Sequence, residues 1–203
     1  MKVLLVNGGP HPKGCTNRAL EEVEKALKEE GIETLIYHIP NVPLQDCIAC
    51  GSCAKTGKCV FDDCVNEIAQ KFEEADGLVV GTPVYYGSAN ATLIAFLTRL
   101  FYSTPFDKTM KVGASAVVAR RKIQSFMDRV FYSAKSAFVH KPAAVISSSR
   151  RAGSVTSMDV LNKHLSVSEM PIVTSNYWNE VHGHTPSDVE QDREGLDTRY
   201  ALG

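Results

Sequence analysis

Short apolar runs alternate with amphipathic stretches along most of this chain, and turn residues separate the two. Three runs are too short for helices and read as strands, at residues 2–7, 32–39 and 76–81. Two stretches repeat apolar residues at helical spacing, from Thr16 as N-cap to about residue 30, and from Asp62 or Asp63 to about residue 74. Strands that alternate with helices predict an α/β fold of three layers with a parallel sheet.

The middle of the chain contains an internal repeat, because residues 92–121 and 122–151 align without gaps. Each copy reads as an amphipathic helix followed by a strand, at 112–118 in the first copy and 143–147 in the second. Extruding either unit would expose several large apolar side chains, at roughly 1.5–3 kcal/mol for each. We therefore expect an inserted unit and six parallel strands in the order 2-1-3-4-4′-5. The alternative is that one copy forms a surface flap.

The rest of the chain predicts a helix at 154–165 and a last strand at 170–175. Residues 176–203 are polar and show little periodicity, and no linker divides the chain. We therefore expect a single domain over residues 1–203.

Charge and composition exclude several classes of protein. The 203 residues include 22 basic and 23 acidic side chains, so the net charge gives the chain no general attraction to nucleic acid or to an anionic membrane. No apolar run approaches the roughly 20 residues that span a bilayer, and the first residues lack the pattern of a signal peptide. The expected location is the cytoplasm, with no nucleic-acid or membrane partner.

Five of the six cysteines fall within residues 47–64, which favours metal binding or redox chemistry in a reducing compartment. The spacing Cys47-x2-Cys50-x2-Cys53-x5-Cys59 suits the corners of a [4Fe–4S] cluster. Structural zinc is the weaker interpretation, because it usually takes two separated pairs of cysteines. A set of small, half-buried residues without special chemistry is the plainest alternative. Cys15 and Cys64 are expected to be structural.

Two loops could bind a ligand at the carboxyl edge of the sheet. Residues 8–17 join the first strand to the first helix, where backbone N–H groups and the helix dipole favour a phosphate. This loop is neither a dinucleotide fingerprint nor a Walker loop. Residues 82–88 follow the third strand, and the adjacent Tyr85 and Tyr86 could cover a planar ring. Two half-buried aromatic residues in a turn are the alternative.

These motifs together resemble the NADPH-dependent FMN reductase family, and within it the iron–sulfur flavoproteins most. The resemblance rests on the first loop, on the cysteine run that ends at residues 57–63, on Ala75-Asp76-Gly77 and on residues 83–87. Residues 149–153 and 177–183 also match. The similarity covers the chain except one copy of the repeat. It implies a flavodoxin-like fold that binds FMN noncovalently and takes electrons from NAD(P)H or a protein donor.

The resemblance also implies which residues hold the cofactor. The family's phosphate loop reads Gly-Ser-Pro-Arg followed by Gly-Asn-Thr, and here Gly9, His11 and Cys15 replace the serine, the arginine and the asparagine. An inserted first copy of the repeat would bring Arg120 and Arg121 nearest the flavin, whereas an extruded one would bring Arg150 and Arg151 there. The implied FMN-binding residues are Gly9, Pro10, His11, Thr16, Asn17, Pro83, Val84, Tyr85, Tyr86, Gly87, Arg120, Arg121, Arg150, Arg151 and Gly153.

The leading hypothesis is an FMN-dependent oxidoreductase or electron-transfer flavoprotein, with a [4Fe–4S] cluster on Cys47, Cys50, Cys53 and Cys59. Its partners would be a small-molecule or protein electron donor and acceptor, and its assembly a homodimer or homotetramer. One competitor is a noncatalytic metal- or cluster-binding protein of the same fold that has lost flavin. Another is a damaged or engineered duplicate with little activity. The family usually has a further helix after residues 201–203 that covers one face of the sheet, and we expect that cover to be missing.

Overall fold

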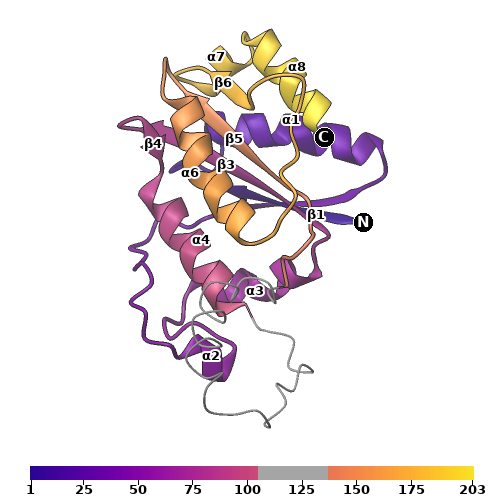
Figure 1. Cartoon of the computed structure of the whole chain (residues 1–203). Coiled ribbons are helices and arrows are strands. Elements are labelled where there is room, and N and C mark those ends of the chain that lie inside the picture. The colour runs from indigo at the N-terminus through magenta and orange to yellow at the C-terminus, as the bar shows by residue number, and fades with distance from the viewer. Residues whose placement is uncertain (105–136) are drawn as a thin grey trace.

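A parallel sheet in the order β2-β1-β3-β5-β6 forms the centre of the structure, with helices on both faces (Figure 1). The structure is a computed structural model that describes residues 1–104 and 137–203. Within those ranges a short strand, β4, pairs antiparallel with β3. The strands are β1 (Lys2–Asn7), β2 (Glu33–His38), β3 (Gly77–Tyr85), β4 (Ser88–Ala89), β5 (Ala143–Ser149) and β6 (Glu180–His182).

The helices of the described residues form the outer two layers. Helices α1, α7 and α8 lie on one face of the sheet, and α3, α4 and α6 lie on the other (Figure 1). The short α2 lies beside α4, away from the sheet. The helices are α1 (Cys15–Glu29), α2 (Cys53–Thr56), α3 (Cys64–Glu74), α4 (Ala91–Ser103), α6 (Ser154–Val167), α7 (Pro186–Val189) and α8 (Arg193–Leu202).

Two apolar clusters hold the layers together, because successive strand residues point to opposite faces. Leu4 and Val6 of β1 pack among residues of α3, α4 and α6, whereas Leu5 packs against α1. Val145 and Ile146 of β5 divide between the clusters in the same way. Burial on both faces explains why these strands read as continuous apolar runs. The predicted three-layer α/β fold is confirmed.

The crossover after β3 differs from the predicted one. Strand β5 pairs directly with β3, from Leu78 opposite Ala143 to Pro83 opposite Ser148. No strand therefore lies between them, and the expected order 2-1-3-4-4′-5 is wrong. The strand of the second repeat copy is buried along its whole length and fills the place beside β3 itself. The expected strand at 112–118 and the second expected helix lie outside the described residues, as do Arg120 and Arg121.

The last part of the chain is more regular than its sequence suggests. The strand expected at 170–175 is wrong, because only Ile172 forms a single bridge, opposite Ala143, and the edge strand is β6. Residues 176–203, whose sequence is polar and shows little periodicity, contain β6, α7 and α8. Caps define these short helices: a capping box joins Thr185 to Asp188, and the Asp192 side chain accepts from the N–H of Gly195. Helix α8 packs on α1, so this face has a covering helix.

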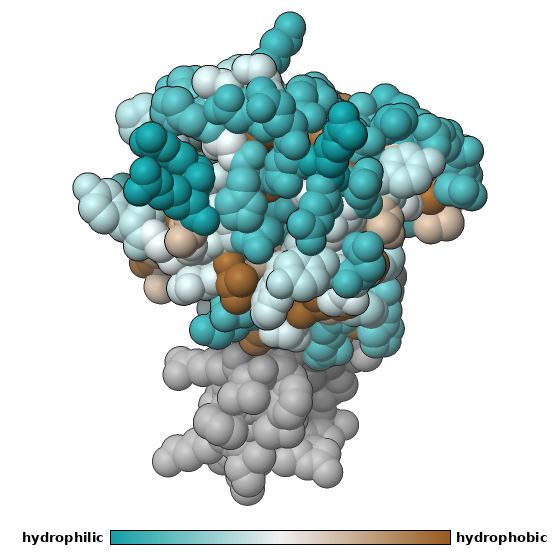
Figure 2. Space-filling model, turned by 90° about the horizontal axis from the view of Figure 1, so that it is seen from above, coloured by the Kyte–Doolittle hydropathy of each residue, from teal (hydrophilic) through white to brown (hydrophobic). Residues whose placement is uncertain are grey.

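The surface agrees with the balanced composition. Seen from above, it is largely hydrophilic, and hydrophobic residues form small separate spots (Figure 2). Among the described helices, none is long and apolar enough to cross a membrane.

Candidate functional site

The N-terminus of α1 is the centre of the candidate site. Its N-cap is Gly14, which has an extended backbone and no side chain to accept from the first-turn amides. No acidic residue lies in this first turn. The N–H groups that begin a helix have no partner within it, so this end favours an anion. The prediction that Thr16 caps the helix is wrong, because Thr16 lies inside the first turn.

The loop before α1 is held on several sides. Asn90, at the start of α4, donates to the carbonyl of Gly8 at 2.6 Å. The N–H of Gly9 donates to Asn7 Oδ1 at 2.9 Å, and the carbonyl of Gly9 lies 2.9 Å from Nε2 of His38. A Cβ atom at Gly9 would lie only 3.0 Å from Asn7 Oδ1. The absence of a side chain there lets the loop fold closely around the end of β1.

A cavity of about 260 Å³ opens where this loop meets the carboxyl ends of β3 and β5. At its wall, Thr16 Oγ and Ser148 Oγ lie 2.7 Å apart in a buried hydrogen bond. The cavity is thus formed by segments that are far apart in the sequence. Its lining residues are Gly9, Pro10, His11, Gly14, Cys15, Thr16, Pro83, Val84, Tyr85, Ser148, Ser149, Arg150, Gly183 and His184.

Strand β3 continues beyond its predicted end at residue 81 and forms a tight hairpin with β4. Tyr86 and Gly87 have φ values of 52° and 72°, which suits a two-residue turn. Tyr85 lines the cavity, whereas the Tyr86 side chain is fully exposed. Gly153 packs against this hairpin, because a Cβ there would lie 2.9 Å from both Gly87 Cα and Val84 Cγ1. The hairpin and the loop after β5 therefore fix each other.

The cavity brings together many, though not all, of the residues expected to bind the cofactor. Those that line it are Gly9, Pro10, His11, Thr16, Pro83, Val84, Tyr85 and Arg150. The expected residues Asn17, Tyr86, Gly87, Arg151 and Gly153 are described by the structure and lie outside the lining. The Asn17 side chain instead accepts from Asn7 at 3.2 Å and donates to Glu21 at 2.6 Å.

Six lining residues are not among the FMN-binding residues named singly from the sequence, although Gly14 and Cys15 lie in the predicted phosphate loop. Gly14 and Cys15 belong to the first loop, and Ser148 and Ser149 directly precede the Arg150-Arg151 pair, so both motifs could have indicated them. Gly183 ends the segment 177–183 that carries part of the family resemblance, whereas His184 has no such signal.

Three basic side chains, His11, Arg150 and His184, give the cavity groups that can balance an anion. Cys15 also lines it, and its thiol lies 3.8 Å from the carbonyl of Gly183. Burial raises the pKa of the Cys15 thiol, and the nearby charge of Asp188 raises it further. Cys15 is therefore a neutral thiol at neutral pH and adds no charge against a phosphate.

The cysteine run lies away from this cavity, in a segment beside α4 that contains the short helix α2, which begins at Cys53. Cys47 and Cys50 are exposed, and Cys53 and Cys59 are half-buried. Burial raises the pKa of the Cys53 thiol above its ordinary value. Cys64 is buried in the core.

Four thiols are a donor set that fits an iron–sulfur cluster. Within residues 1–104 and 137–203, however, no three Cys, His, Asp or Glu side chains converge on one point as metal ligands. The run thus has the thiol ligands that a cluster needs. Two of them, Cys47 and Cys50, are exposed to solvent. The assignment of the four cysteines to a metal stays a prediction.

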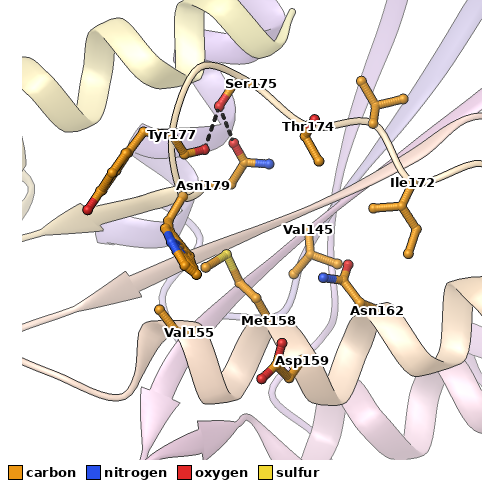
Figure 3. A pocket seen from close by; sticks show the side chains of 12 residues that line it. Val145, Val155, Met158, Asp159, Asn162, Ile172, Thr174, Ser175, Tyr177 and Asn179 are labelled. Carbon is orange, nitrogen blue, oxygen red and sulfur yellow. Dashed lines mark hydrogen bonds between the residues drawn. The ribbon is translucent and has the colours of Figure 1, made fainter.

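A second cavity, of about 320 Å³, lies between α6 and the segment 172–179 (Figure 3). Met158 and Val145 form part of its apolar wall, and Ser175 Oγ donates to the carbonyl of Tyr177 at 3.0 Å and to Asn179 Oδ1 at 2.7 Å. None of its lining residues is basic. The smaller cavity at α1 is therefore the better site for a phosphorylated ligand.

Comparison with known proteins gives the chain a family. A model of the NADPH-dependent FMN reductases matches residues 1–125. An iron-sulfur flavoprotein of Methanocaldococcus jannaschii is 30% identical over the whole chain and 94% of its own length. An NAD(P)H:quinone oxidoreductase from Methanothermobacter marburgensis is 14% identical, with a TM-score of 0.61 over 98% of this chain and 94% of that one.

A flavodoxin, WrbA-like protein from Agrobacterium tumefaciens is also 14% identical, with a TM-score of 0.52 over 98% of this chain and 93% of that one. At these identities the two solved structures show the fold alone, which is flavodoxin-like, as the resemblance implied. The family match spans more than half of the chain and includes both the loop at α1 and the hairpin after β3. By sequence and by fold, then, the chain belongs to the NADPH-dependent FMN reductase family.

Proposed function

We propose that the protein binds FMN in the cavity at α1 and acts as an oxidoreductase or electron-transfer flavoprotein. The observation that carries this proposal is the uncapped N-terminus of α1, which opens into a cavity shared with the β3–β4 hairpin and the loop after β5. The phosphate would accept hydrogen bonds from the first-turn amides and from Thr16. The charge of Arg150 would add to this attraction.

The flavin ring would lie near Pro83, Val84 and Tyr85, with the loop 150–153 approaching its pyrimidine side. Bound FMN would supply the electron chemistry, and the protein would orient the flavin ring and tune its potential. The tethered loop before α1 and the packed pair of Gly87 and Gly153 would keep the site in shape before the cofactor binds. The electron donor would be NAD(P)H or a reduced protein.

We further propose that Cys47, Cys50, Cys53 and Cys59 hold a [4Fe–4S] cluster. Two observations support it: the thiol donor set with its spacing, and the relationship to a protein named an iron-sulfur flavoprotein. The cluster would exchange single electrons with the flavin and with a partner. The homodimer or homotetramer and the cytoplasmic location stay predictions.

A visible absorption spectrum of the anaerobically purified protein tests both proposals at once. We expect flavin bands together with a broad iron–sulfur absorption, and bleaching of the flavin bands when NADH or NADPH is added. A protein that stays colourless after incubation with FMN, iron and sulfide would contradict both proposals. Flavin bands without bound iron would remove the cluster alone, and a cluster without flavin would favour the noncatalytic alternative.

A further inference from the structure

Arg99 of α4 is fully buried and directs its guanidinium into the cysteine segment. Nη1 donates to Asp63 Oδ2 at 2.7 Å and to the carbonyl of Gln45 at 3.1 Å. Nη2 donates to Asp63 Oδ1 at 2.8 Å and to the carbonyl of Phe61 at 3.4 Å. Nε donates to the Sγ atom of Cys59 at 3.2 Å. All five N–H groups of the side chain therefore bind the segment 45–63.

Cys59 is fixed by its backbone as well as by its sulfur. Its N–H donates to Asn66 Oδ1 at 3.0 Å, and Asn66 Nδ2 donates back to the carbonyl of Cys59 at 3.1 Å. In the part of the chain that the structure describes, no other thiol of the run accepts a hydrogen bond from a side chain. Cys59 is thus the anchored member of the four, whereas Cys47 and Cys50 are exposed.

Helix α4 connects this anchor to the candidate flavin site. Asn90, at the N-cap of α4, donates to the carbonyl of Gly8 beside the phosphate loop. Arg99 follows nine residues later, about 14 Å along the helix at 1.5 Å per residue. One rigid element therefore sets the position of Cys59 relative to the loop at α1.

We propose that Arg99 is a positioning residue for the iron–sulfur cluster: it holds Cys59 as the fixed ligand and raises the cluster's reduction potential. The inference rests on the cluster in the proposed function. When a [4Fe–4S] cluster takes up one electron from a reductant, it gains one negative charge. An N–H donor and a positive charge at a ligand sulfur stabilise that added charge. Asp63 carries the opposite charge and limits the effect.

Three variants separate this tuning from a purely structural role. Arg99→Gln removes the positive charge, Arg99→Lys keeps the charge and loses the planar fork, and Asp63→Asn removes the negative charge with little change in shape. After anaerobic reconstitution, the potential is measured by titration with dithionite and followed by electron paramagnetic resonance. Lys28→Gln, on the exposed side of α1, is the matched control for loss of a positive charge.

We expect Arg99→Gln to lower the one-electron reduction equilibrium constant by roughly tenfold, a shift of about 59 mV. Arg99→Lys should lower the reduction potential by a smaller amount than Arg99→Gln does. Asp63→Asn should raise the reduction potential. Lys28→Gln should leave it unchanged. A loss of packing alone has no reason to produce shifts of opposite sign for the two members of one ion pair.

Equal potentials in all variants that keep their iron would overturn the inference and leave the cluster in place. The same holds if Arg99→Gln fails to fold while Arg99→Lys and Asp63→Asn match the wild type, with circular dichroism as the check of folding. If the wild type binds no iron after reconstitution, the cluster is removed from the proposed function, and the inference fails with it. Retention of FMN distinguishes that result from failure of the flavin site.

Discussion

Thr16 Oγ and Ser148 Oγ share a buried hydrogen bond of 2.7 Å, which joins the first turn of α1 to the end of β5. The two residues are 132 positions apart in the sequence. Because each hydroxyl holds the other, the Thr16 side chain is oriented before any ligand arrives. When Ser148 is the donor in this bond, Thr16 keeps its own proton to donate to a phosphate at α1.

Replacing Thr16 with valine should weaken FMN binding by about 1–3 kcal/mol, because the phosphate loses a charge-assisted hydrogen bond. Ser148→Ala should weaken it in the same direction through loss of the Thr16 orientation, and the double variant should be less than additive. Quenching of FMN fluorescence in a titration measures the affinity. Thr34→Val on β2, which loses a hydrogen bond to Glu24 of α1, is the control. Equal affinity in Thr16→Val and Thr34→Val would contradict the phosphate placement.

Gly153→Ala should destabilise the protein and reduce FMN affinity, because the new methyl group would meet Gly87 and Val84 at 2.9 Å. Gly31→Ala is the control, since Gly31 also has a positive φ, of 73°, and no atom lies within 4 Å of its Cβ position. The control should lose only about 1–2 kcal/mol of unfolding free energy, which is the cost of holding an alanine in a left-handed backbone conformation. In urea unfolding, Gly153→Ala should lower the free energy of unfolding by about 1–3 kcal/mol more than the control does. If the two variants match, the contact between hairpin and loop is not tight.

Replacing either of two buried arginines with methionine should change the free energy of unfolding, but by very different amounts. Arg99 forms a bidentate ion pair with the half-buried Asp63, so Arg99→Met should cost about 2–3 kcal/mol by leaving that carboxylate without its partner. Arg199 donates to the carbonyl of Trp178, while its Nε and Nη1 have no hydrogen-bond partner among the described residues. Burial lowers the pKa of Arg199 to about 10, which indicates that its charge is unfavourable there.

Arg199→Met should therefore change stability by less than about 1 kcal/mol, or increase it. Urea unfolding of both variants at neutral pH checks the contrast. A loss at Arg199 as large as the loss at Arg99 would mean that the Arg199 guanidinium is solvated or paired in solution.

Asn66→Ala should free the backbone around Cys59, because the Asn66 side chain bonds to the N–H of Cys59 and to the carbonyls of Cys59 and Phe61. We expect amide hydrogen exchange at Cys59 to increase at least tenfold, measured by mass spectrometry of the peptide that contains it. Gln70→Ala, on the exposed side of the same helix, should leave the exchange unchanged. Unchanged exchange in Asn66→Ala would show that other contacts hold this turn.

The sequence predicts the elements whose signals are local. Strands β1 and β3 are apolar on both faces and end near glycine or proline, so their existence follows from a few neighbouring residues. Strand β6 has three residues, of which only Val181 is fully buried. So short a strand gives no recognisable hydrophobic pattern among the polar residues around it. The repeat led to the wrong strand order for a similar reason. It offers two candidate strands for the position beside β3, and only the pairing with β3 shows that residues 143–149 occupy it.

The candidate site also contains some features that follow from local sequence and others that depend on long-range packing. The loop at α1 and the residues 83–85 are readable as motifs, because each is a short segment at the end of a strand. The bond between Thr16 and Ser148 and the pairing of Arg99 with Asp63 depend on the packing of elements that are distant in sequence. Arg99 itself sits in an apolar stretch of α4, where nothing local indicates a partner 36 residues away.

The outer edge of the sheet contains a mismatch in chain length. Ile172 lies opposite Ala143, and Glu180 lies opposite Ser147, so eight steps along the outer segment correspond to four along β5. The four surplus residues bow outward and form the wall of the cavity in Figure 3. The number of residues in the outer segment therefore helps to shape that cavity, together with the side chains of α6 and β5 that line it. Removing four of the five residues 174–178 would bring the two registers into one continuous edge strand and take away this wall of the cavity.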